Sequence, residues 1–108
     1  MNRKIIIKNK EYKMPKMSAD TYMDYLDLSE QVSADTKKGY NRQQIEAMIL
    51  FVCKAYGNQF TADELKDMEN GGMDIAGIIL EFQFIDVAIA EEMDAKIEKI
   101  QKNFTTGK

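Results

Sequence analysis

Residues 74–101 read DIAGIILEFQFIDVAIAEEMDAKIEKIQ, a run with no proline and, after Gly77, no glycine. A set of apolar residues recurs in this run at spacings of three and four, the period of a helix with one apolar face. The members of this main stripe are Ile75, Ile78, Ile79, Phe82, Ile89, Met93, Ile97 and Ile100. The run predicts one long helix from Asp74 to Gln101. Its first half is interpreted as a core element, and its second half, which is apolar on one side only, runs along the core or beyond it.

A second apolar set points roughly the opposite way in the first half of this helix, and its members are Leu80, Phe84, Val87 and Ala88. A helix that is apolar on two sides must be covered on two sides. Either the rest of the chain or a partner protein covers the second set. The first interpretation is favoured, because a small domain needs all its apolar area.

Asp86 is the misfit, because it falls inside the main stripe. It is either a buried charge that gives specificity or a contact to a lysine of a partner. Two commoner arrangements are a position at the rim of the stripe and a pair with the chain's own N-terminal lysines. The pattern does not decide between them.

The chain has 108 residues, 44% of them hydrophobic and 31% charged, as is typical of a soluble domain with one modest core. We predict a single domain over 1–108, with a β-hairpin at 1–16, a helical body at 17–103 and a flexible tail at 104–108. Apolar runs are too short for a transmembrane span or a signal peptide. We therefore expect the chain to act in the cytoplasm, without contact to a membrane.

Histidine is absent, and Cys53 is the single cysteine. This removes the commonest general base, the Ser-His and Cys-His pairs, and the usual zinc ligand sets. We therefore predict no catalytic residue, no metal site and no cofactor. Cys53, on the flank of a predicted helix, is interpreted as an inert small hydrophobe.

The net charge of −3 is divided unevenly, with +5 on residues 1–16 and −8 on the remainder. Such a basic segment binds an anionic partner, the acidic body of its own chain or a neighbouring copy. The alternative function is therefore a small nucleic-acid-binding accessory protein that uses the basic hairpin. It is disfavoured because Tyr12 is the one aromatic residue there and no nucleic-acid motif is present. We expect weak self-association and no specific nucleic-acid binding.

The N-terminus carries a hairpin signal. Ile5, Ile6 and Ile7 are β-branched, and Asn9-Lys10 is interpreted as a two-residue turn before a second strand that Pro15 ends. An isolated hairpin is only marginally stable, so this one must pack on the helices.

Helix signals follow the hairpin. Ser18 is a predicted N-cap, and residues Ser33–Tyr40 form a predicted polar loop. Asn41 and Gln44 form a capping box that opens an apolar helix, which Gly57 ends.

A second capping box, Thr61 with Glu64, opens a short helix that turns Leu65 and Met68 inward before Gly71-Gly72 breaks it. Together with the long helix, these signals predict a mainly α fold of about four helices, with an N-terminal β-hairpin.

The segment YGNQFTADEL at residues 56–65 resembles the tail assembly chaperones of long-tailed, siphophage-type bacteriophages. In that family an apolar helix ends in a similar turn and a short acidic helix follows. The segment KEYKMPK at residues 10–16 is similar to the opening hairpin of the family. The resemblance extends over most of the chain by the order of its elements, and none of the matching residues is a catalytic signature.

The resemblance implies a protein that is not an enzyme. Members coat the tape-measure protein, keep it soluble and help recruit subunits of the major tail (tube) protein. They act in the cytoplasm of the bacterial host and are absent from the finished virion. A client of this kind is a long helix with apolar stripes, which would be read by apolar surface at helical spacing. The candidate partner-binding residues are Leu80, Phe84, Val87, Ala88 and Asp86.

Overall fold

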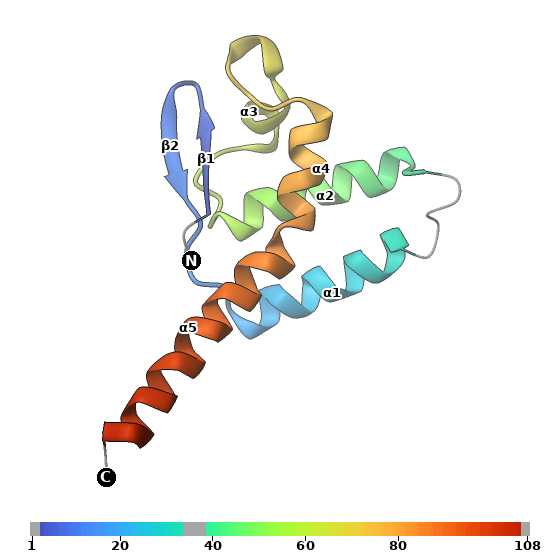
Figure 1. The fold of residues 1–108 in the computed structure, drawn as a ribbon. Helices are drawn as coiled ribbons and strands as arrows, with labels where there is room; N and C mark the ends of the chain where they lie inside the picture. The colour runs from blue at the N-terminus through green and yellow to red at the C-terminus, as the bar shows by residue number, and fades with distance from the viewer. Residues whose placement is uncertain (1–2, 34–38, 107–108) are drawn as a thin grey trace.

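The computed structural model describes residues 3–33 and 39–106, with side chains at all of these positions except 33 and 102–106. An antiparallel hairpin comes first, helices follow, and the last helix is long and leaves the body (Figure 1). The predicted fold class, mainly α-helical with an N-terminal β-hairpin, is confirmed.

The hairpin consists of strand β1 (Lys4–Ile7) and strand β2 (Lys10–Lys13), which pair antiparallel. Lys8 and Asn9 form the turn, with φ angles of 54° and 65°. The predicted turn is wrong by one position, because Asn9 takes the second left-handed position and Lys10 is already paired. Two residues with positive φ give a turn whose twist matches that of the strands, which explains this register.

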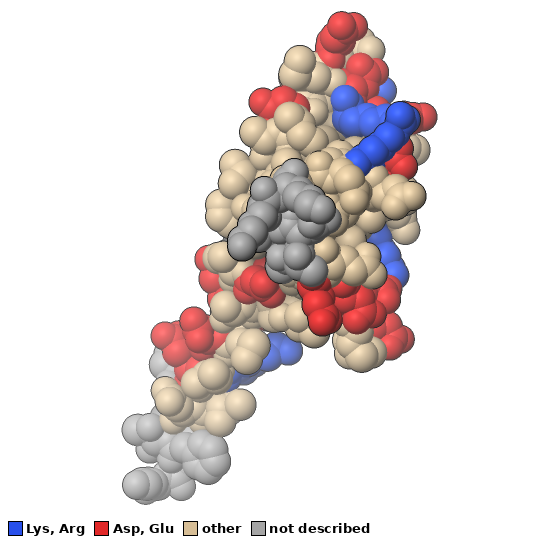
Figure 2. Space-filling view, turned by 90° about the vertical axis from the view of Figure 1, so that its right-hand side faces the viewer, with Lys and Arg blue, Asp and Glu red and all other residues tan. Residues whose placement is uncertain are grey.

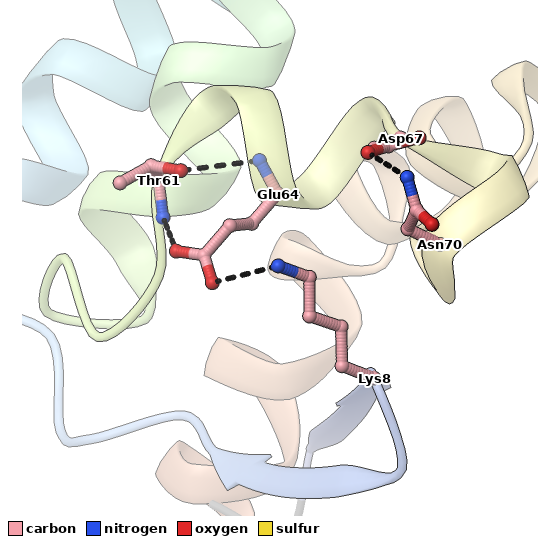
Figure 3. A network of polar contacts seen from close by, with 5 residues as sticks. All are labelled: Lys8, Thr61, Glu64, Asp67 and Asn70. Carbon is pink, nitrogen blue, oxygen red and sulfur yellow. Dashed lines mark hydrogen bonds and ion pairs between the residues drawn. The ribbon is translucent and has the colours of Figure 1, made fainter.

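The hairpin is attached to the helical body along one face and at its tip. Ile5 and Ile7 of β1 are buried in the core. At the tip, the backbone N–H of Lys8 donates to the carbonyl of Gly71 at 3.1 Å, and its ammonium lies 3.7 Å from Glu64 (Figure 3). Helical residues that are distant in sequence therefore support the hairpin.

The first two helices, α1 (Ala19–Ser33) and α2 (Arg42–Ala55), begin where the capping signals predict. The Ser18 hydroxyl accepts a hydrogen bond from the backbone N–H three residues on, at 3.2 Å. Asn41 and Gln44 form both hydrogen bonds of a capping box. Most of the predicted loop between these helices, residues 34–38, lies outside the described residues.

Helix α3 (Ala62–Lys66) also begins with its predicted capping box, and the 3-10 helix η2 (Met68–Asn70) follows it. Leu65 is buried as predicted, whereas Met68 is exposed. The inward orientation predicted for Met68 is wrong, because α3 ends before it and η2 does not continue the period. Gly71, with a φ of 94°, then turns the chain toward the last helices.

The run predicted as one long helix is interrupted once, and this part of the prediction is corrected. Helix α4 (Ile75–Gln83) and helix α5 (Ile85–Thr106) meet at Phe84, whose ψ of −3° departs from the helical value. The N–H of Phe84 still donates to Leu80 at 2.9 Å, and its carbonyl accepts from Ala88 at 2.9 Å. The break is therefore local. It lets α4 cross and pack against α2 while α5 takes a different direction out of the body (Figure 1).

The core lies where β1, α1, α2 and α4 meet. The ring of Tyr25 on α1 lies 5.6 Å from that of Phe51 on α2 and 5.1 Å from that of Phe82 on α4. Ile85 and Glu81 are also buried, although the sequence pattern did not place them in the core. Ile85 continues the buried face of α4 across the break.

The main stripe is only half buried. Ile78 and Phe82 are buried and Ile79 and Ile89 pack against the core, whereas the remaining members, Ile75, Met93, Ile97 and Ile100, are exposed. Of the two courses expected for the second half of the run, along the core or beyond it, the structure shows the second for Met93, Ile97 and Ile100. Because α5 extends beyond the helices beside it, Met93, Ile97 and Ile100 are not covered by any element within residues 3–33 and 39–106 (Figure 1). We call residues 90–106 of α5 the arm. Its backbone is helical through Thr106, past the start of the predicted tail at residue 104.

Candidate partner-binding surface

Three of the predicted partner-binding residues form an exposed apolar patch on the side of α4 and α5 that faces away from the core. Leu80, Phe84 and Val87 are 47%, 39% and 48% exposed. We call these three residues the Phe84 face. Ala88 is buried against the body and lies outside this face. The interpretation that the chain itself covers the second apolar set therefore holds for Ala88 alone.

Phe84 is flanked by a charged group whose position no sequence pattern predicts. The guanidinium carbon of Arg3 lies 4.9 Å from the centroid of the Phe84 ring, within the range of a cation–π contact. The same guanidinium donates to the carboxylate of Glu81 at 2.5 Å. Arg3, directly before β1, thus connects the hairpin to the junction between α4 and α5.

Glu81 is the buried member of this pair, and Arg3 is 33% exposed. The phenol of Tyr56 belongs to the same interior region, where burial and then the Glu81 charge raise its pKa above the ordinary value. A buried carboxylate needs a partner. Spacing alone could have placed Glu81 near the buried side, since it is one turn after Ile78, but no local pattern identifies Arg3 as its partner.

Asp86 is held by the chain's own tyrosines. Its carboxylate accepts hydrogen bonds from Tyr22 at 3.1 Å and Tyr25 at 3.0 Å, both on α1. Burial, followed by this hydrogen bond, raises the pKa of Tyr25 to about 12. The rim position suggested for Asp86 fits best, but its partners are hydroxyls of α1 and not lysines of the hairpin. Asp86 therefore attaches the first turn of α5 to α1, on a side of the helix away from the Phe84 face.

The basic hairpin has several of its charges paired within the chain. Arg3 contacts Glu81, Lys4 lies 2.9 Å from Glu11 across the ladder, and Lys8 contacts Glu64. The pairs of Arg3 and Lys8 follow the interpretation in which the basic segment meets its own acidic body, whereas the pair of Lys4 lies within the hairpin. These pairs reduce the positive charge on which the nucleic-acid alternative depends.

Cys53 and the acidic side chains are candidate reactive or metal-binding groups within the described part of the chain. Burial raises the pKa of the Cys53 thiol, which keeps it in the unreactive protonated form. Over residues 3–33 and 39–101, no group of three or more cysteine and acidic side chains is arranged to hold a metal ion. Within the described part of the chain, no helix is long and apolar enough to cross a membrane.

The surface pattern agrees with a protein that binds other proteins. Figure 2 shows acidic side chains gathered along the lower part of one face, with both charge signs and uncharged surface on the arm. Exposed apolar residues that occur in sets at helical spacing are typical of docking sites for helices. In this chain such sets lie on α4 and on α5.

Comparison with known proteins now gives the family. The sequence model of the phage tail chaperone proteins matches residues 1–103. No curated protein and no solved structure matches the chain. Since the family match spans the hairpin, the helical body and most of the arm, the chain belongs to the phage tail chaperone protein family.

Proposed function

We propose that this tail chaperone binds the tape-measure protein, keeps it soluble in the cytoplasm of the bacterial host, and helps recruit subunits of the tail tube around it. The role is that of a binding protein without catalysis, and the chaperone leaves before the virion is finished. Family membership supports a role in tail assembly, and the Phe84 face supports the choice of a helical client.

The observation that carries the proposal is the exposure of Leu80, Phe84 and Val87 at spacings of four and three. Side chains with this spacing form a row that fits the apolar stripe of another helix. A tape-measure protein is a long helical chain, so it presents many such stripes. The large ring of Phe84, flanked by the Arg3 guanidinium, makes this residue the expected anchor of the contact.

The test is co-expression of the chaperone with the tape-measure protein, followed by measurement of how much tape-measure protein stays soluble and co-purifies. Phe84→Asp places a charge at the centre of the face and is expected to abolish both. Leu50→Asp is the matched control, because Leu50 is 62% exposed on α2, away from the face. It receives the same charge and is expected to leave both readouts unchanged.

Circular dichroism of the purified variants separates loss of binding from loss of folding. If Phe84→Asp unfolds the protein, Val87→Asp is used in its place, because Val87 is more exposed than Phe84. A folded variant of the face that still keeps the tape-measure protein soluble would show that the client binds elsewhere.

Self-association belongs to the same proposal. The basic hairpin and acidic body permit head-to-body contacts between copies, and heterologous contacts of this kind form rings or open spirals. Sedimentation at low and high salt tests this, since screening should weaken such contacts. Only monomer at high concentration and low salt would refute it.

A further inference from the structure

The arm presents a second apolar surface, distinct from the Phe84 face. Met93, Ile97 and Ile100 are 56%, 47% and 54% exposed and follow one another at spacings of four and three. We call these three residues the arm stripe. At about 100° per residue, the arm stripe lies on a different side of α5 from Val87. The two apolar surfaces therefore face different directions.

Charged residues flank the arm stripe in an ordered way. Asp94 and Glu98 are exposed about 90–130° to one side of it, and Lys96 and Lys99 are exposed about 70–130° to the other side. Glu92 also falls on the basic side but already has an interaction within the chain. The stripe thus has one acidic edge and one basic edge.

This charge order disfavours a second copy of the chain as the occupant. If two arms paired antiparallel, the same edge of each would meet, so acidic residues would face acidic residues and basic residues would face basic residues. Like charges placed opposite one another in this way are destabilising.

If two arms paired parallel, the acidic edge of each would face the basic edge of the other. The bodies of the two copies would then lie at the same end of the pair. There, Asp86 lies on the same side of the helix as the arm stripe and is bonded to Tyr22 and Tyr25 of α1. Helix α1 therefore occupies the position into which the α5 helix of the second copy would have to continue. Another protein's helix, which can begin beside the arm or cross it, meets no such obstacle.

We propose that the arm stripe docks an amphipathic helix of the client whose apolar row has a basic edge on one side and an acidic edge on the other. The inference rests on the proposed function, because the helix is assigned to the client protein. The Phe84 face and the arm stripe then contact two separate helical segments of the client. One chaperone therefore covers more of the client than it would with one apolar surface.

The test uses three designed helical peptides with leucine at the a and d positions of three heptads. The mixed peptide has lysine along one edge and glutamate along the other, and two control peptides have lysine or glutamate along both edges. Affinity for the full chain is measured by fluorescence anisotropy at low salt. The mixed peptide should bind about tenfold more tightly than either control, since exposed pairs are individually weak and act together here.

Variants of the arm complete the test. Ile97→Asp should remove the preference for the mixed peptide, whereas Leu50→Asp, outside both apolar surfaces, should leave it unchanged. Asp94→Lys with Glu98→Lys makes both edges basic, so this variant should prefer the all-glutamate peptide. Equal affinity for the three peptides, or no binding of any, would overturn the inference.

A dimer that Ile97→Asp abolishes would also overturn the inference, because a second copy would then be the occupant. None of these outcomes depends on the tape-measure protein. If the peptide test fails, the co-expression test of the Phe84 face is unaffected. If the co-expression test fails, the peptide result for the arm stripe is unaffected.

Discussion

The buried carboxylate of Glu81 makes the most demanding prediction about stability. Arg3→Met would remove its partner and leave a charge inside the core. Removal of one member of a fully buried pair costs about 3–5 kcal/mol of the free energy of unfolding. Because Arg3 is itself 33% exposed, water supplies part of the lost interaction, and we expect a loss of about 2–3 kcal/mol.

The assay is urea unfolding followed by circular dichroism, with Lys4→Met as the matched control. Lys4 pairs with Glu11, but both side chains are exposed, so we expect a change within about 0.5 kcal/mol. In the double variant Arg3→Met/Glu81→Met, an apolar pair replaces the ion pair. Its stability should return to within about 1 kcal/mol of the unmodified protein.

Two results would refute this reasoning. One is an Arg3→Met variant as stable as the Lys4→Met control, which would mean that Glu81 is solvated. The other is a double variant whose destabilisation equals the sum of the two single losses, because that would show no coupling between the partners.

Three further predictions concern the helices and the interior. Asn41→Ala should lower the free energy of unfolding by about 1 kcal/mol in the same assay, because it removes the N-cap of α2; no change would show that the cap is not needed. The raised pKa of Tyr25 keeps its phenol neutral in the folded protein, so its contribution to stability is complete below pH 10.0 and should be lost as pH rises toward about 12. Unfolding of Tyr25→Phe should depend less on pH over this interval, and equal dependence would contradict the assignment. Cys53 should react with a thiol reagent only as fast as the protein opens, and rapid labelling in native buffer would contradict its burial.

Local rules explain which parts of the fold could be predicted. The capping boxes at Asn41 and Thr61 involve residues three positions apart, so they are visible in any sequence and occur where predicted. The turn at Lys8 and Asn9 was predicted one position late because Asn tolerates both positions of such a turn, and the pairing of the whole ladder decides between them.

The site was predictable in part. Helical periodicity grouped Leu80, Phe84 and Val87 on the side opposite the main stripe, but the favoured interpretation, that the chain itself covers them, is wrong for these three exposed residues. It could not show that Arg3 would lie beside Phe84, because the two residues are brought together only by the packing of the hairpin on α4.

The exposure of the arm stripe was one of two alternatives that the sequence left open, since the second half of the helix could run along the core or beyond it. Phe82 and Ile97 belong to one periodic pattern, yet the first is buried and the second is 47% exposed. The difference lies in how far α1 and α2 extend beside the last helix, which no property of residues 74–101 encodes.

The small size of each apolar surface suits the proposed function. A stable interface buries about 800 Å² on each partner, far more than three half-exposed side chains of the Phe84 face or of the arm stripe can supply. Each contact with the client should therefore be weak and short-lived when it is made alone. Along a tape-measure protein with many helical stripes, two contacts per copy and contacts between copies would add by avidity. On the proposed function, such a coat would stay bound while it is complete and would be removed copy by copy as tube subunits take its place.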